Sequence, residues 1–174
     1  MSAASAGPLV VLIGPPGAGK STVGAMLAER LGVGLRDTDA DIEASQGVSV
    51  QDIFVSEGEP FFRDLEVTAV ARALAEHDGV LSLGGGAVMR EETQAALAGH
   101  RVVFLDVDLA RAAARVGMNS GRPLLLGNVR GQLKTLMDAR RPLYASVARH
   151  RVDTSGLAAR QVAEQILELI EESA

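Results

Sequence analysis

The sequence predicts an α/β fold in which a mostly parallel β-sheet is covered by helices on both faces. Short apolar runs alternate with longer segments of helical periodicity from one end of the chain to the other. Residues 9–13 (LVVLI) are apolar on both faces, as expected of a central parallel strand. A glycine-rich segment follows this run directly, and sheets of this kind bind ligands beyond the carboxyl ends of their strands.

The first half of the chain predicts three strands, each followed by glycine-rich or helix-patterned sequence. The strand at 9–13 stops at Gly14, and a helix is expected from about 20 to 31, where Gly32 ends it. A short strand near 34–37 precedes helices near 39–46 and 49–55. Residues 60–76 have apolar side chains on helical spacing: Phe61, Phe62, Leu65, Ala69, Ala73 and Leu74. The third strand, 80–83, runs directly into Gly84-Gly85-Gly86.

The second half predicts two more strands. A strand over 101–107 is followed by a helix near 109–116. Residues 117–128 show no period and are rich in turn-forming residues, which predicts a mobile loop. Residues 131–149 are helical in pattern, and Pro142 is expected to kink or interrupt that helix. A strand at 151–154 precedes a closing helix with apolar residues at three- and four-residue intervals: Leu157, Val162, Ile166, Leu169 and Ile170.

The composition is that of one globular domain and excludes several classes. The 174 residues are 47% hydrophobic and 22% charged, which is incompatible with intrinsic disorder. Without cysteine there can be no disulfides and no thiolate sites. No apolar run approaches the roughly 18 residues of a membrane span, and no export signal is recognisable, so we expect a cytoplasmic protein without a membrane partner. The net charge of −5 and the absence of Trp argue against a nucleic-acid partner.

The strongest motif is a phosphate-binding loop. Gly14-Pro15-Pro16-Gly17-Ala18-Gly19-Lys20-Ser21 fits the pattern G-x-x-x-x-G-K-[ST], with a strand before it and a helix after it. In such a loop the backbone N–H groups and the helix N-terminus bind phosphate oxygens. Lys20 can reach the β- and γ-phosphates, and the Ser21 hydroxyl can bind Mg²⁺.

Two carboxylates follow the second predicted strand. Asp37 and Asp39 are two residues apart, so on an extended segment they point to the same side. One could hold Mg²⁺ through water while the other accepts a proton from a substrate hydroxyl. The alternative is helix capping, with Asp39 as the cap and Asp41 in the first turn.

Arginines and glycines suggest a site for an oxygen-rich acceptor. Arg63 and Glu66 are one helical turn apart, which predicts either an ordinary surface ion pair or a carboxylate-binding Arg oriented by Glu66. Gly84-Gly85-Gly86 is either a plain turn or a place where the backbone approaches a ligand closely. The predicted loop contains Arg122, which could close over phosphates. Arg140 and Arg141 are adjacent, and either could be a second carboxylate ligand.

Taken in order along nearly the whole chain, these segments resemble the shikimate kinases. The resemblance implies a P-loop, nucleoside-monophosphate-kinase-like fold, a three-layer α/β/α sandwich with a five-stranded parallel sheet. It implies a single domain over 1–174, with substrate-binding helices at about 38–66 and a mobile lid at about 117–128. It further implies phosphorylation of the shikimate 3-hydroxyl by ATP, with Mg²⁺, on the route to chorismate and aromatic amino acids, by a monomer.

The resemblance also assigns roles by position. Asp39 would be the catalytic base and hold the reacting diol, and Asp37 would order Mg²⁺ beside Ser21. Shikimate would be bound by Asp39, Arg63, Gly84, Gly85, Gly86 and Arg140. The nucleotide would be bound by Gly17, Ala18, Gly19, Lys20, Ser21, Thr22, Arg115 and Arg122, of which Lys20 and Arg122 would also be catalytic.

Two other functions remain open from the residues. A gluconate or nucleoside-monophosphate kinase would share the phosphate side of the site, and gluconate also carries a carboxylate and hydroxyls. A nucleotide-binding module without catalysis is the alternative from another class. The combination of Lys20, Ser21, Asp37, Asp39 and Arg122 favours catalysis over that alternative.

Overall fold

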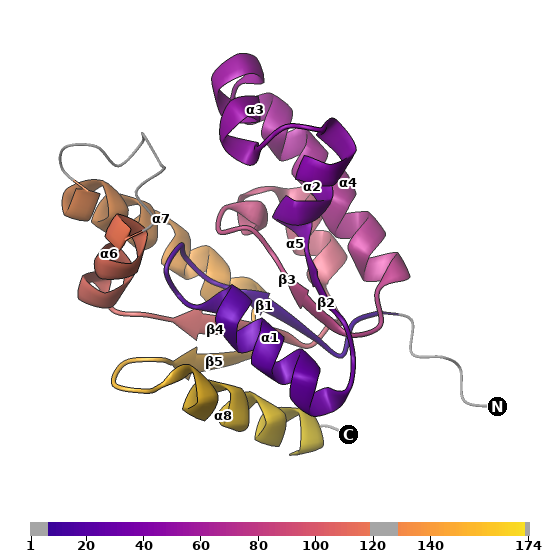
Figure 1. The fold of residues 1–174 in the computed structure, drawn as a ribbon, viewed down its shortest axis with the longest axis vertical. Helices are drawn as coiled ribbons and strands as arrows, with labels where there is room; N and C mark the ends of the chain where they lie inside the picture. Colours follow the sequence, from indigo (N-terminus) through magenta and orange to yellow (C-terminus); the bar gives the residue numbers. More distant parts are fainter. Residues whose placement is uncertain (1–6, 119–128, 173–174) are drawn as a thin grey trace.

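In the computed structural model, which describes residues 7–118 and 129–172, five strands form one parallel sheet (Figure 1). The strands are β1 (Val10–Ile13), β2 (Leu35–Asp37), β3 (Val80–Ser82), β4 (Val102–Asp106) and β5 (His150–Asp153). Their order across the sheet is β2-β3-β1-β4-β5, and every neighbouring pair is parallel. The expected α/β fold with a five-stranded parallel sheet is confirmed.

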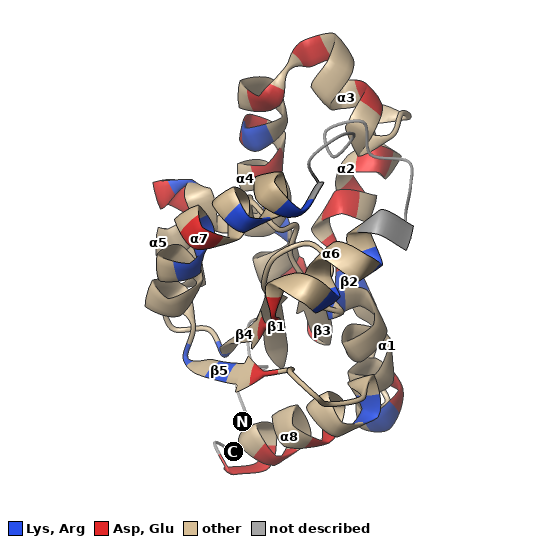
Figure 2. Ribbon diagram, turned by 90° about the vertical axis from the view of Figure 1, so that its left-hand side faces the viewer, with Lys and Arg blue, Asp and Glu red and all other residues tan. Residues whose placement is uncertain are grey.

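The helices lie on both faces of the sheet. They are α1 (Lys20–Leu31), α2 (Thr38–Gln46), α3 (Val50–Glu57), α4 (Glu59–Glu76), α5 (Glu91–Leu97), α6 (Leu109–Met118), α7 (Val129–Val147), α8 (Ala159–Glu172) and a short 3₁₀ helix, η1 (Ala87–Met89). Among them no helix is both long and apolar enough to cross a membrane. Figure 2 shows acidic residues at intervals along α3 and α8.

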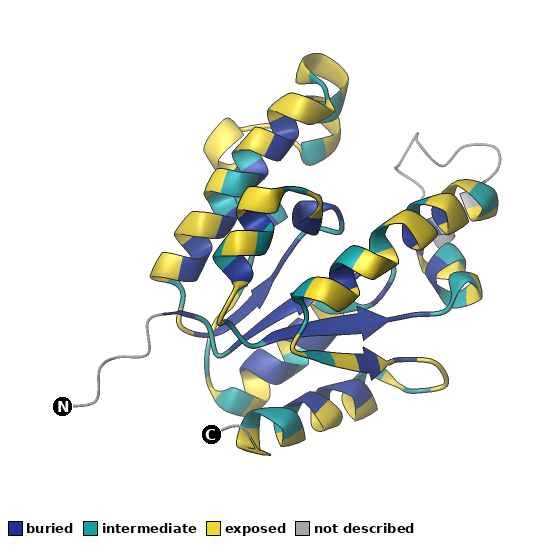
Figure 3. Ribbon diagram, turned by 180° about the vertical axis from the view of Figure 1, so that it is seen from behind, coloured by how far each residue is buried: buried dark blue, intermediate teal, exposed yellow. Residues whose placement is uncertain are grey.

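Side chains of the central strands alternate between two cores. Val10 and Leu12 of β1 belong to the core shared with α1 and α8, whereas Val11 and Ile13 belong to the core shared with α4 and α5. These four side chains are at most 1% exposed, and the central strands are dark blue in Figure 3. Helix α7 contributes to both cores, because Met137 packs in the first and Tyr144 in the second.

The segment over α2, α3 and the start of α4 has a small core of its own. Ile42, Ile53 and Phe62 pack together, one from each helix, and each is 2% exposed. This group of helices rises from one edge of the sheet (Figure 1). It includes the residues 38–66 that were expected to bind the substrate.

The elements differ from the expectations in three places. Helix α7 runs continuously through Pro142, which therefore does not interrupt it. Helix α5 and η1 were not expected, because α5 is short and buries only Thr93 and Leu97. Helix α6 extends through residues 117 and 118, where the loop was expected to begin; residues 119–128, the rest of the expected lid, lie outside the described residues.

Candidate active site

The predicted phosphate-binding loop lies between β1 and α1. Gly17 has a φ of 81°, and a Cβ there would lie 2.8 Å from the carbonyl oxygen of Ala112. At Gly14 a Cβ would lie 2.7 Å from the carbonyl oxygen of Leu105. The glycines are thus required both by the backbone conformation and by close packing. Helix α1 begins with Gly19 as its cap and has no side-chain hydrogen bond at its N-terminus, as an anion-binding helix end requires.

Lys20 folds back over this loop. Its Nζ donates hydrogen bonds to the carbonyl oxygens of Gly14, at 2.7 Å, and Pro15, at 3.0 Å. Ser21 and Thr22, the next two residues of α1, are exposed. The ammonium group therefore lies at the loop where the motif predicts phosphate, next to an accessible hydroxyl.

A pocket opens beside the loop on the α8 side. Its lining includes the predicted nucleotide residues Ala18, Gly19, Thr22 and Arg115. Arg115 comes from α6, and its Nη1 donates to the carbonyl oxygen of Gly17 at 2.8 Å. The other lining residues were not assigned from the sequence. Val23 is a buried residue of α1. The rest come from the end of β5 to the first turns of α8 and reach the loop only in the fold: Thr154, Leu157, Ala159 and Val162.

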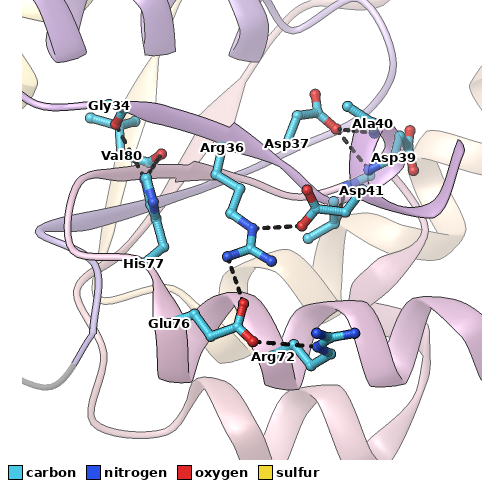
Figure 4. Close-up of polar contacts among 12 residues, drawn as sticks. Gly34, Arg36, Asp37, Asp39, Ala40, Asp41, Arg72, Glu76, His77 and Val80 are labelled. Atoms are coloured by element: carbon cyan, nitrogen blue, oxygen red, sulfur yellow. Dashed lines mark hydrogen bonds and ion pairs between the residues drawn. The ribbon is translucent and has the colours of Figure 1, made fainter. Parts of the chain in front are cut away.

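Asp37 and Asp39 lie where β2 gives way to α2. The Asp37 carboxylate caps α2, accepting from the backbone N–H groups of Asp39, at 2.8 Å, and Ala40, at 3.4 Å (Figure 4). The expected cap was Asp39, so that reading was wrong. The strand ends at Asp37 and Asp39 is already helical, so the two carboxylates do not share one face of an extended segment.

A bridge of ion pairs ties this junction to α4. Arg36 of β2 donates to Asp41 of α2, at 2.6 Å, and to Glu76 of α4, at 3.1 Å (Figure 4). This contact and the cap at Asp37 together fix the first turn of α2, which carries Asp39.

Gly84-Gly85-Gly86, called here the glycine turn, follows β3 at the centre of the site. A Cβ at Gly84 would lie 2.7 Å from Asp39 Oδ1 and 2.9 Å from Glu66 Oε2. A Cβ at Gly86 would lie 2.4 Å from Arg63 Nη2. At Gly85 the neighbour is Pro16 of the phosphate loop, at 3.1 Å. None of the three glycines has a positive φ, so they are there for close approach and not for an unusual backbone conformation.

Arg63 is buried on α4. Its Nη1 donates to Glu66 at 2.7 Å and its Nε to Glu59 at 3.2 Å. The guanidinium carbon lies 5.8 Å from the ring centre of Phe54 and 5.3 Å from that of Phe62, within the range of a cation–π contact. The expected Arg63–Glu66 ion pair is thus present, but it is buried beneath the glycine turn, unlike an ordinary surface pair.

Glu66 is 1% exposed. Burial raises the pKa of its carboxyl above the ordinary value, because the charged form is desolvated, and the nearby Arg63 and Arg140 guanidiniums lower it. Both arginines therefore converge on one buried carboxylate, although they come from different helices.

Arg140 and Arg141 point to different neighbours. Arg141 pairs with Asp106 at 3.0 Å. Arg140 instead lies near Tyr144 and Glu66, where its positive charge partly opposes the rise in pKa that burial causes at both groups. Tyr144 was not assigned to the site from the sequence. Its hydroxyl donates to the carbonyl oxygen of Gly85, and burial raises its pKa to about 12.

The site thus has two sides that meet at the glycine turn. The expected phosphate side consists of the P-loop, α1 and Arg115, and the expected acceptor side of Asp39, Arg63 and Arg140. Arg122, the predicted lid residue, lies outside the described residues.

Comparisons with known proteins give one family along most of the chain. Residues 16–171 match the family model described as shikimate kinase. A shikimate kinase of Streptomyces avermitilis is 56% identical over 164 residues, which cover 94% of this chain and 96% of the relative. One of Thermobifida fusca is 58% identical over 93% of this chain and 94% of its own length. The solved structure of Acinetobacter baumannii shikimate kinase in complex with shikimate has a TM-score of 0.88 at 35% identity, covering 98% of this chain and 96% of that chain.

Proposed function

The chain belongs to the shikimate kinase family, and from this premise we propose how its residues phosphorylate shikimate. The enzyme transfers the γ-phosphoryl group of ATP to the 3-hydroxyl of shikimate and releases shikimate 3-phosphate and ADP. The reaction belongs to the biosynthesis of chorismate and aromatic amino acids.

One observation carries the assignment of the acceptor site. The glycine turn touches Asp39, Arg63 and the phosphate loop at the same time. A small acceptor bound on this turn would therefore have a carboxylate base, an Arg and the transferred phosphate within reach together. Phosphoryl transfer depends on such positioning more than on covalent chemistry.

Arg63 and Arg140 are proposed to bind the shikimate carboxylate. Guanidinium groups bind carboxylates through two charge-assisted hydrogen bonds. Glu59, Glu66 and the two phenylalanine rings hold the Arg63 side chain in place, so less side-chain entropy is lost on binding. The backbone of the glycine turn, with no side chains in the way, is proposed to face the ring hydroxyls.

Asp39 is proposed as the catalytic base. It would hydrogen-bond the reacting hydroxyl and accept its proton as the oxygen bonds to the γ-phosphorus and the bond to the ADP oxygen breaks. The support is its position: it lies against Gly84, in the first turn of α2, which Asp37 caps.

On the phosphate side, the backbone N–H groups from Gly17 to Lys20 are proposed to bind the β- and γ-phosphates. Lys20 would exchange its two carbonyl acceptors for phosphate oxygens. Arg115 and Thr22 are proposed to lie along the nucleoside in the pocket beside α8. The proposed role of Arg122 is to neutralise charge on the γ-phosphate.

The residues present fit a magnesium ion. Ser21 and Asp37 offer a hydroxyl and a carboxylate, the hard oxygen ligands that Mg²⁺ prefers. In the described residues no group of three metal-ligating side chains occurs, in keeping with an ion held mainly by phosphates and water. When bound, Mg²⁺ supplies charge neutralisation at the phosphates. Ser21 and Asp37 would hold the ion, Asp37 through water.

The remaining expectations stay predictions: a monomer, located in the cytoplasm, with small-molecule substrates and neither a nucleic-acid nor a membrane partner.

ADP release by purified protein with MgATP tests the proposal. Shikimate, gluconate, AMP and no acceptor are compared under identical conditions. We expect strong stimulation by shikimate alone. Stimulation by gluconate or AMP instead would be consistent with the proposed phosphate-binding residues but would overturn the proposed acceptor-binding residues. Tight ATP binding without stimulation by any acceptor would favour a non-catalytic binding module.

A further inference from the structure

Two adjacent arginines on α7, Arg140 and Arg141, contact different parts of the protein. Arg140 shares a helix face with Tyr144, four residues on, which packs in the core on the α4 side. Arg141 is rotated by about 100° from Arg140 on the helix. Both arginines lie within one turn of Met137 and Tyr144, so the contact that distinguishes Arg141 is its ion pair with Asp106. Met137 and Tyr144 anchor α7 in the two cores, and the remaining freedom of the turn at 140–141 decides which arginine reaches the proposed acceptor side.

Asp106 holds Arg141. This aspartate ends β4, and its side chain is 5% exposed. It accepts from Arg141 Nη1 at 3.0 Å and from Arg151 Nη2, on β5, at 2.6 Å. This buried carboxylate should hold both arginines firmly, because a buried charge without a partner would cost several kcal/mol of folding free energy.

The turn of α7 that contains Arg141 also contains Pro142, which weakens the backbone hydrogen bonding of the helix. Pro142 lacks an N–H group, so the helix loses one backbone hydrogen bond there, and an interior proline costs about 3 kcal/mol. External contacts flank it: Arg141 to Asp106 on one side, and the Tyr144 hydroxyl to the Gly85 carbonyl oxygen on the other. These contacts account for the helix running unbroken through the proline.

We propose that Asp106 is a positioning residue for substrate recognition: by holding Arg141 it fixes the rotation of α7 and leaves Arg140 to bind the acceptor carboxylate. The inference rests on the proposed function, which makes Arg140 a shikimate ligand. It adds that the Asp106–Arg141 ion pair determines which of the two arginines is left to bind the acceptor carboxylate.

The same residue also touches the nucleotide side, but through its backbone. The Asp106 carbonyl oxygen accepts from the N–H and the hydroxyl of Thr154, at 2.8 and 2.9 Å, and Thr154 lines the nucleotide pocket. A side-chain substitution at Asp106 leaves these two bonds available. Its effect should therefore be confined to the acceptor.

Steady-state kinetics of a set of variants tests this inference. Arg141→Met and Asp106→Asn should each raise the KM for shikimate about three- to tenfold, since a displacement well under 1 Å of a binding group weakens recognition. The KM for ATP should stay within about twofold. The double variant Asp106→Asn/Arg141→Met should be no worse than the more affected single variant, because both substitutions break one pair. Arg141→Lys, which keeps the charge, should recover part of the loss.

Arg140→Met separates this inference from the proposed function. If Arg140→Met leaves the KM for shikimate unchanged, the proposed carboxylate ligand is wrong. If Arg140→Met raises that KM, Arg141→Met should add nothing to it in the double variant Arg140→Met/Arg141→Met. A further increase would mean that Arg141 contacts the substrate itself and would overturn the inference.

Arg151→Met is the matched control. It removes the other cation on Asp106 but belongs to β5 and not to α7, so the KM for shikimate should stay within about twofold of wild type. Melting temperatures are measured throughout. A lower melting temperature for Arg141→Met with an unchanged KM for shikimate would make the pair merely structural and would also overturn the inference. If Asp106→Asn fails to fold, Arg141→Met decides, since the Arg141 side chain is 46% exposed.

Discussion

Gly86→Ala is the sharpest test of the glycine turn as a substrate-binding element. The new Cβ would lie 2.4 Å from Arg63 Nη2 and 2.6 Å from Nη1 and Cζ. Ordinary contacts of a Cβ begin at 3.4 Å, so the guanidinium must move by about 1 Å. The backbone at Gly86 has a negative φ, which alanine adopts without strain, so the clash with Arg63 is the main perturbation.

The expected effect falls on binding more than on folding. Misplacing a binding group by about 1 Å can lower catalytic efficiency by as much as 10²-fold. A charge-assisted hydrogen bond contributes about 1.5–3 kcal/mol of interaction free energy. We therefore expect the KM for shikimate to rise by about 10- to 100-fold. The clashing atoms belong to a side chain and not to the backbone, so unfolding should become easier by about 1–2 kcal/mol, which lowers the Tm by about 2–8 °C.

The assay is steady-state ADP release at saturating ATP with shikimate varied, together with thermal unfolding. Gly34→Ala is the matched control, because its Cβ would make an ordinary contact of 3.6 Å with His77. In the double variant Arg63→Ala/Gly86→Ala, the KM for shikimate should be close to that of Arg63→Ala alone. Wild-type affinity for shikimate in Gly86→Ala would refute the reasoning, since Arg63 could then bind substrate from a different position or not at all.

Three further outcomes are expected. Arg63→Ala should raise the KM for shikimate by about 10-fold or more with the KM for ATP nearly unchanged; unchanged affinity for shikimate would reduce Arg63 to an ion-pair residue. Burial raises the folded-state pKa of Glu66, so its contribution to stability is full below the unfolded pKa of about 4.3 and is lost as pH rises through the folded value. The Tm of wild type minus that of Glu66→Gln should accordingly decrease as the pH rises above about 4.3, and a difference that does not change with pH would contradict the raised pKa. Excess EDTA should abolish ADP release without changing the Tm of the nucleotide-free protein, because Ser21 and Asp37 are proposed to hold the cation only together with nucleotide phosphates; a lowered Tm would indicate a structural metal.

The features that could be predicted from the sequence are local ones. The phosphate loop is encoded by eight consecutive residues between a strand and a helix, so both its identity and its position were predictable. The alternation of elements similarly predicted the parallel sheet. Helix α5 was missed because seven residues with two buried positions carry too weak a period.

The acceptor side depends on contacts between distant segments. Three consecutive glycines signalled close approach, but the approaching groups come from α2, from α4 and from the phosphate loop. The Arg63–Glu66 spacing fits a surface pair equally well, and only the packing of α4 beneath the glycine turn buries it. Arg140 and Arg141 are adjacent in the sequence, and only the fold shows that Arg141 pairs with Asp106 and that Tyr144, on the same helix, bonds to Gly85.

Pro142 shows how tertiary contacts override a local rule. An interior proline predicts a break, yet α7 is continuous, because the chain is held on both sides of the missing hydrogen bond. Similarly, Asp39 is a residue type that favours helix caps, but α2 begins at Thr38, two residues earlier than a cap at Asp39 requires, so Asp37 is the cap.

The turnover number of Asp39→Asn with shikimate and MgATP tests the central claim most directly. Asparagine keeps the shape of the side chain but cannot accept the proton, so kcat should fall by about 10²- to 10⁴-fold. The Kd for ATP, measured by titration calorimetry, should stay within about twofold of wild type, because Asp39 lies on the acceptor side. A kcat near that of wild type would remove Asp39 from the role of base and contradict the account.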